Sequence, residues 1–158
     1  MSAEIVGLIS DTHGMLRADV FTALAGVGLI LHAGDVGGSD ILDELAAIAP
    51  VQAVFGNTDP PGHPGLVERI ERNIGGVSIH VSHGHEIESL KPDRLLAAYD
   101  ARVIVYGHTH RALIEAHGDR LVVNPGAAGA RRFKLLPSVA LLRLEGGRAT
   151  AELIALQP

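Results

Sequence analysis

Five times along this chain, a short apolar run stops directly before a group of polar side chains. The runs are residues 5–10, 29–31, 51–55, 77–82 and 102–106. The polar groups after them are Asp11-Thr12-His13, His32-Ala33-Gly34-Asp35, Gly56-Asn57-Thr58-Asp59, His83-Gly84-His85 and Gly107-His108-Thr109-His110. Apolar runs of this length that stop at turn residues are typical of buried strands. We therefore expect strands whose carboxyl ends carry the polar groups, the edge at which open α/β sheets place ligands.

The segments between the first runs predict helices that cover a parallel sheet. Apolar residues recur at helical spacing in residues 16–25 and 39–49, and residues 92–99 begin with a proline suited to a first helical turn. Because consecutive parallel units cross over with the same hand, the first three strand ends should lie side by side.

Three later stretches predict β-hairpins and therefore antiparallel pairing, because each joins two β-like runs by a short turn that contains glycine. They are residues 66–82 around Gly75-Gly76, residues 112–124 around Gly118-Asp119 and residues 139–155 around Gly146-Gly147. The last hairpin carries no cluster of ligand-type side chains, so we expect it to be structural. The expected chain is an α/β protein with a parallel first half before an antiparallel second half.

The composition fits a single domain over residues 1–158 with an aliphatic core, since 47% of the residues are hydrophobic and only 3% are aromatic. Few aromatic residues leave no platform for stacking single-stranded bases. The formal net charge of −5 argues against stable nucleic-acid binding, although a nucleotide could still be a substrate.

Two features of the sequence limit the metal chemistry and the location. The chain has no cysteine, so any metal must be held by nitrogen and oxygen donors. The start, Met1 to Val6, carries an acid where a signal peptide would be basic, and no apolar run approaches the length of a membrane span. We expect a cytoplasmic protein without a membrane segment.

His108 and His110 would point the same way if the backbone stays extended, with Thr109 on the other side. Two convergent imidazoles indicate a metal site, but two solvated or core-satisfied histidines would leave the same pattern. Asp11 and His13 have the same spacing, and their alternative is an Asx turn or a cap. By contrast, His32 lies on its strand and is expected to be a supporting core histidine rather than a ligand.

Taken together, the polar groups contain more donors than one tetrahedral metal needs. The seven candidate ligands are Asp11, His13, Asp35, Asn57, His83, His108 and His110. Such a set suits two ions roughly 3.5 to 4 Å apart that share a carboxylate, an arrangement used for phosphoryl hydrolysis.

The order of these motifs resembles the calcineurin-like metallophosphoesterase superfamily over residues 5 to about 126. The short length, Ser82-His83-Gly84-His85 and Asn124-Pro125-Gly126 are similar to its small bacterial and archaeal phosphodiesterase branch. The resemblance implies an α/β sandwich of two mixed β-sheets flanked by helices, with a dimetal site at the strand ends. It also implies that Asp35 bridges the ions.

Carried over to this chain, the resemblance divides the remaining ligands between the ions. It places Asp11, His13 and His110 on the first ion, and Asn57, His83 and His108 on the second. The pair His108 and His110 should therefore split, with Thr109 facing away.

The function implied by the resemblance is phosphoesterase activity, expected on diesters, through attack by a hydroxide held between two metal ions. The expected catalytic residues are Asp35, Asn57, His83, Asp59 and His85. Of these, Asp59 should orient a neighbour, and His85 should support a ligand or face the substrate rather than coordinate. Many superfamily members carry histidine where this chain has Thr58, and a threonine hydroxyl cannot protonate a leaving group near neutral pH. Activated esters should therefore be cleaved better than alkyl esters.

Metal identity and partners follow less directly from the residues. Nitrogen and oxygen ligands rich in histidine suit Mn, with Fe, Ni, Co or Zn as alternatives. The expected partner is a small phosphate ester, and exposed strand edges permit a homo-oligomer. Residues 60–65 and 86–91 are expected to set specificity, and Arg131 and Arg132 to be solvated. The alternative function is an inactive protein-binding scaffold of the same fold, as in retromer-type relatives.

Overall fold

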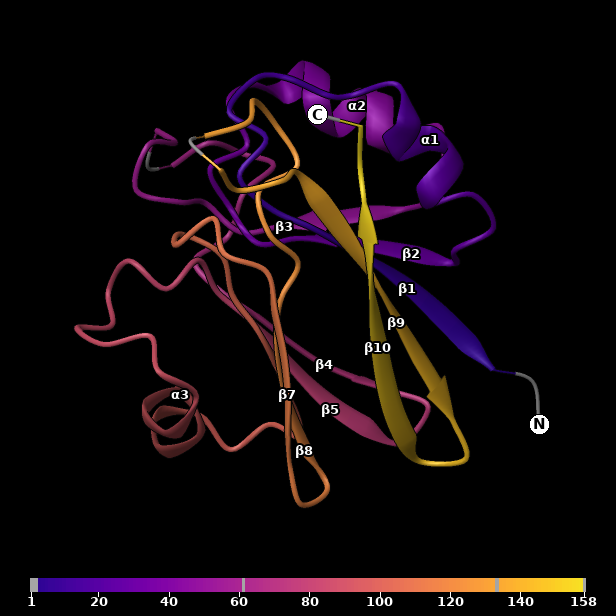
Figure 1. Ribbon diagram of the computed structural model, residues 1–158, viewed down its shortest axis with the longest axis vertical. Coiled ribbons are helices and arrows are strands. Elements are labelled where there is room, and N and C mark those ends of the chain that lie inside the picture. Colours follow the sequence, from indigo (N-terminus) through magenta and orange to yellow (C-terminus); the bar gives the residue numbers. More distant parts are fainter. Residues whose placement is uncertain (1–2, 61, 133, 158) are drawn as a thin grey trace.

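The computed structural model describes residues 3–60, 62–132 and 134–157 and contains two five-stranded sheets with helices against them (Figure 1). The first sheet has the order β10-β9-β1-β2-β3 and consists of β1 (Glu4–Ile9), β2 (Leu29–His32), β3 (Val51–Ala53), β9 (Ser138–Glu145) and β10 (Arg148–Ala155). The second has the order β4-β5-β6-β8-β7 and consists of β4 (Ile70–Ile74), β5 (Val77–Val81), β6 (Val103–Val105), β7 (Leu113–His117) and β8 (Arg120–Asn124). The helices are α1 (Asp19–Ala23), α2 (Ser39–Ala46) and α3 (Pro92–Ala98).

Both sheets are mixed, which confirms the expected sandwich and corrects one expectation. Strands β1, β2 and β3 pair in parallel, and the three predicted hairpins are present. The second half is not simply antiparallel, because β6 pairs in parallel with both β5 and β8. Strand β6 enters between the two hairpins after the α3 crossover. Turn chemistry predicts each hairpin correctly but carries no information on which strand lies beside it.

Apolar side chains pack in three clusters that separate four layers. One cluster fills the space between the sheets and joins residues such as Leu8 and Leu142 to Ile79 and Val105. A second lies between the first sheet and helices α1 and α2, where Ile41 and Leu45 are buried. The third lies between the second sheet and α3 (Figure 1). These clusters are almost wholly aliphatic, as the composition predicts.

Several predicted elements are shorter in the structure. Helix α1 covers only Asp19–Ala23 of the expected 16–25, and it begins without a side-chain cap. Strand β4 begins at Ile70, because Val67 forms an isolated parallel bridge to Val54 instead of extending the hairpin. Over the residues described, no helix is long and apolar enough to cross a membrane. Met1, Ser2 and Pro61, which enter the expectations about the chain start and the specificity loop, lie outside these residues.

Candidate metal centre

The seven predicted ligands follow five strands whose carboxyl ends meet at one edge of the sandwich. Three of these strands, β1, β2 and β3, are neighbours in the first sheet, and β5 and β6 are neighbours in the second. Backbone hydrogen bonds join the loops that follow: the Asp11 N–H donates to Gly34 O at 2.9 Å, and the His13 N–H to Asp35 O at 2.9 Å. Across the sheets, the His108 N–H donates to Asp11 Oδ2 at 3.2 Å. The loops therefore hold one another in place.

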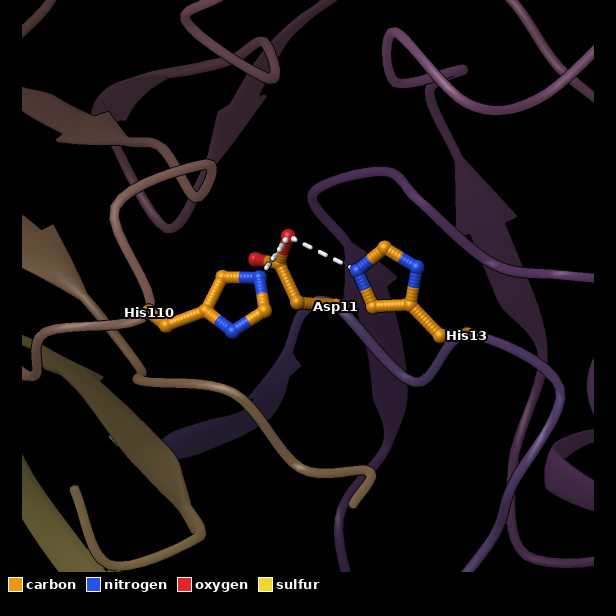
Figure 2. A group of neighbouring side chains, drawn as sticks. All are labelled: Asp11, His13 and His110. Atoms are coloured by element: carbon orange, nitrogen blue, oxygen red, sulfur yellow. Dashed lines mark ion pairs between the residues drawn. The ribbon is translucent and has the colours of Figure 1, made fainter. Parts of the chain in front are cut away.

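A first group of three side chains surrounds Asp11. Figure 2 shows the rings of His13 and His110 on either side of its carboxylate. His110 Nε2 lies 3.3 Å and His13 Nε2 lies 3.8 Å from Asp11 Oδ1. One potential ligand atom from each residue lies within 4.8 Å of the other two. Asp11 is buried, and its other oxygen accepts a hydrogen bond of 2.5 Å from Ser10 Oγ.

A second group consists of Asp35, His83 and His108, whose ligand atoms also lie within 4.8 Å of one another. Asn57 lies beside them, with its Oδ1 at 3.1 Å from both His83 Nε2 and His108 Nδ1. His83 Nδ1 lies 2.8 Å from Ala33 O, an acceptor, so Nδ1 carries the hydrogen. The Nε2 atom of His83 is thereby directed toward Asp35 and Asn57.

Asp35 reaches both groups. Its Oδ2 lies 3.2 Å from His83 Nε2 and 3.6 Å from His13 Nε2. Its Oδ1 accepts hydrogen bonds from the backbone N–H and the hydroxyl of Thr58, at 2.9 and 2.7 Å. Burial by itself would raise the pKa of Asp35, but the hydrogen bonds from His83 and Thr58 outweigh it and hold this pKa well below its ordinary range. The carboxylate is therefore charged.

The histidines of the second group respond to the same charges. Burial by itself would lower the pKa of His83, but the hydrogen bond with Asp35 and the charge of Asp11 outweigh it, so this pKa is raised. The pKa of His108 is lowered, first by burial and then by the neighbouring His83. His83 is therefore the histidine of this group that most readily takes up a proton, and the neighbouring His108 resists taking up a second.

The backbone at the candidate ligands is left-handed, which corrects the expectation of an extended chain. Among the described residues, the non-glycine residues with positive φ are all candidate ligands: Asp11, His13, Asp35, His108 and His110. Because the chain leaves the strand conformation there, simple alternation does not aim the paired side chains, and His108 and His110 join different groups. Left-handed non-glycine residues cost about 1 to 3 kcal/mol each and gather at functional sites. Five at one site indicate a function beyond stability.

The donor set fits divalent metal ions. Asp11 Oδ1 and His13 Nε2 are buried without a hydrogen-bond partner among the described residues, and His110 Nε2 lies 3.3 Å from the same Asp11 oxygen. In the second group, Asp35 Oδ2, Asn57 Oδ1 and the lone pair of His83 Nε2 are three acceptors that face one another. Acceptors gathered in this way require a cation between them, either a proton or a metal. Imidazole, carboxylate and amide oxygen together suit transition metals.

Two further predicted catalytic residues lie outside both groups. Asp59 is buried and accepts hydrogen bonds from the Val36, Gly37 and Gly56 N–H groups at 2.9 to 3.1 Å, so it ties the loop after Asp35 to the loop that carries Asn57. The His85 ring lies 5.5 Å from the His83 ring, and its Nδ1 lies 3.4 Å from Glu86 Oε2. Arg131 and Arg132 are exposed.

Two residues outside both groups support the loops that carry the ligands. His32, confirmed as a buried core histidine, accepts the Gly34 N–H at Nδ1, and its Nε2 lies 3.0 Å from the Thr12 hydroxyl. Asn124 donates to Gly107 O at 3.1 Å and to Thr109 Oγ1 at 3.0 Å. This bond holds Thr109 away from the ligands, as expected. The polar residues at the ends of β2 and β8 were the only signal for these contacts.

Two glycines permit the close approach of the loops. A Cβ at Gly56 would overlap the Asp35 carboxylate, and a Cβ at Gly107 would overlap Ser10 Oγ and Asp11 Oδ2. Any larger residue would displace a candidate ligand. These glycines explain why the apolar runs end in glycine next to the polar groups.

Comparison with known proteins agrees with this geometry. The calcineurin-like phosphoesterase superfamily domain matches residues 5–147. A probable metallophosphoesterase from Methanothermobacter thermautotrophicus is 38% identical over 160 residues, covering 95% of this chain and 91% of the relative. A phosphodiesterase from Methanocaldococcus jannaschii is 27% identical over 139 residues, covering 77% and 82%. The structure of wild-type Vps29 from Entamoeba histolytica, complexed with Zn²⁺, has a TM-score of 0.74 at 27% identity, covering 96% of this chain and 98% of that one.

Proposed function

Because the chain belongs to the calcineurin-like phosphoesterase superfamily, we propose that it hydrolyses small phosphate diesters with two divalent transition-metal ions. The observation that carries the proposal is the position of Asp35 between two separate groups of ligands. Asp11, His13 and His110 would hold one ion, and Asn57, His83 and His108 the other. We further propose that the ions are manganese, that residues 1–158 form one domain and that the protein is cytoplasmic, as expected from the sequence.

The ions would supply Lewis-acid charge that polarises the phosphoryl oxygens and activates water. The protein's own residues set the geometry. His83 and Asn57 meet at 3.1 Å, and Thr58 fixes the carboxylate of Asp35 through two hydrogen bonds. A phosphate bound here gains its position from these side chains before reaction, which reduces the entropy lost in reaching the transition state.

Thr58 has a second consequence, for the leaving group. Its hydroxyl donates to Asp35 Oδ1 and is not a proton source near neutral pH. His85 lies beside the site with 29% of its side chain exposed, so we assign it to contact with the substrate. Leaving groups that depart as stable anions should therefore react fastest.

The decisive experiment measures metal content and turnover on the same protein. We expect two equivalents of bound metal after loading with Mn²⁺ and faster hydrolysis of bis(4-nitrophenyl) phosphate than of 4-nitrophenyl phosphate. Across a series of aryl methyl phosphates, the rate should fall steeply as the pKa of the leaving phenol rises. Equal rates across that series would contradict the assignment of Thr58.

The second candidate function is a protein-binding scaffold, which is favoured by the likeness in fold to a Vps29 structure that holds a cyclic peptide. All seven candidate ligands are present in this chain, whereas a scaffold has no need to keep left-handed strain at five of them. A protein that binds two equivalents of metal but is inert toward both esters would support the scaffold instead.

A further inference from the structure

A groove with a volume of about 850 Å³ begins at the candidate metal centre and runs between the second sheet and the end of β10. Its walls come from four separate parts of the chain: residues 90–92, residues 106 and 109–113, residues 134–138, and residues 153 and 155. His110 and Thr109 line one end. Because His110 Nε2 lies 3.3 Å from Asp11 Oδ1, this end of the groove borders the first group of ligands through His110.

The walls of the groove are aliphatic. Leucines at positions 90, 113, 135, 136 and 153 line it together with two prolines. Leu136 is 53% exposed and Leu153 is 41% exposed, and both belong to the few large apolar side chains that face solvent. Tyr106 is the one aromatic residue among the described lining residues, and it is only 3% exposed. The walls therefore suit an aliphatic group rather than a stacked base.

The charges along the groove are all of one sign apart from the histidine. Lys91, Arg111 and Lys134 line it and are exposed, and no Asp or Glu is present among its described lining residues. This is unusual in a chain with 18 acidic residues and a formal net charge of −5. A cationic rim on an acidic protein favours a ligand that carries negative charge.

We propose that this groove binds one ester substituent of the substrate, an aliphatic chain that carries a second negative charge. The proposal rests on the proposed phosphodiesterase function, because it places the scissile phosphate at the ligands beside His110. Two observations support this choice of ligand: the walls are largely aliphatic, and the charged residues in the described lining are basic, with no acidic residue among them. Lys91, Arg111, Lys134 and Leu136 become specificity-determining residues.

The test compares three diesters that share 4-nitrophenolate as leaving group, so that the chemical step stays the same. Their second substituents are methyl, hexyl and 5-carboxypentyl. We expect kcat/KM to rise about tenfold from methyl to hexyl, as for the burial of about two of the five added methylene groups. A further rise of about threefold is expected from hexyl to 5-carboxypentyl, as for exposed ion pairs.

Substitutions of exposed groove residues should lower the two kcat/KM ratios, hexyl to methyl and 5-carboxypentyl to hexyl. The double change Arg111→Glu with Lys134→Glu should bring the carboxylate ratio below one, and Leu136→Ser should reduce the hexyl-to-methyl ratio. Arg148→Glu, on the same strand as Leu153 but outside the groove, and Phe21→Ser, on α1, are matched controls that should leave both ratios unchanged. All these positions are exposed, so the substitutions do not disturb the core.

The failure of this proposal is distinct from that of the proposed function. Turnover of the methyl ester with no gain from either longer substituent would overturn the groove assignment and keep the phosphodiesterase. A dimer that Leu136→Ser dissociates, together with ratios of one, would assign this face to a second copy of the chain. If no ester is turned over, binding of octanoate to the metal-free protein decides: NMR shifts confined to residues 134–138 and 111–113 support the groove, and their absence overturns it.

Discussion

The two groups of candidate ligands differ in how the protein holds them. In the first group, Asp11 Oδ1 and His13 Nε2 are buried without a hydrogen-bond partner among the described residues. In the second, Asp35 accepts two hydrogen bonds from Thr58, and His83 is oriented by Ala33 O. Buried polar atoms without a partner are costly. The comparison indicates that the protein's own hydrogen bonds hold the ligands of the second group more completely than those of the first, while both groups gather acceptors that need a cation between them.

The largest effect is expected at Asp35, because its Oδ2 lies 3.2 Å from His83 Nε2 in one group and 3.6 Å from His13 Nε2 in the other. Asp35→Asn should lose about 10³-fold in turnover, as the loss of several kcal/mol of metal-centred stabilisation implies. It should also reduce the bound metal to fewer than two equivalents. Asp11→Asn should still bind the ion held by Asn57, His83 and His108. Metal analysis and kcat/KM check both outcomes, and Asp43→Asn on α2 is the control. Two retained equivalents with full turnover in Asp35→Asn would contradict the bridging position.

The second-largest effect is expected from metal removal, which should affect the two groups of ligands to different extents. Chelation should lower the free energy of unfolding by about 4 kcal/mol if the ion is present at 1,000 times its dissociation constant. Hydrogen exchange in the metal-free protein should increase more at residues 11–14 than at residues 56–59, because Asp59 still holds the second loop through three N–H groups. An equal increase in both loops would remove the distinction.

The pH dependence of stability tests the role of His32, which contacts the loops that carry Asp11 and Asp35. His32 contacts Thr12 in the first loop and Gly34 in the second, and burial lowers its pKa from 6.5 to about 4. Between these values the unfolded chain takes up a proton that the folded chain cannot. The free energy of unfolding should therefore fall by about 3 kcal/mol as pH drops from above 6.5 to about 4, and it is unaffected by this group at higher pH.

The measurement is urea unfolding of metal-free protein between pH 4 and pH 7.5. His32→Gln keeps a side chain able to bond Thr12 but does not titrate, so its stability should vary less with pH by that amount. Matching pH slopes in the two proteins would show that His32 is not the group responsible.

The smallest expected effects come from the hydroxyls that support each group. Thr58→Val removes a 2.7 Å hydrogen bond to Asp35, and Ser10→Ala removes a 2.5 Å hydrogen bond to Asp11. Each should weaken metal binding about tenfold, as for other partners of metal ligands. Calorimetric titration should show the Thr58→Val effect mainly on the second ion and the Ser10→Ala effect on the first. If both variants weakened binding of the same ion, the two groups of ligands would not act as separate metal sites.

The sequence predicted the strand ends well because that signal is local. An apolar run followed within a few residues by a ligand-type side chain marks where β1, β2, β3, β5 and β6 end, and the structure brings these five ends together. The hairpins were equally local, since Gly75 and Gly76 both adopt the positive φ that their turn requires. Pairing between distant strands has no such signal, so the parallel contacts of β6 were missed.

By itself, the sequence determined which side chains could serve as ligands and that each follows a strand, because residue identity and apolar periodicity are properties of short segments. The division of those side chains into two groups around Asp35 was expected only from the family resemblance, and it is the tertiary structure that brings each group together. The tertiary structure also decided that Leu136 and Lys134 would lie beside Lys91 and Leu153 in one groove. These arrangements depend on left-handed turns and on contacts between residues far apart in the chain, and both are set by the packing of one sheet against the other.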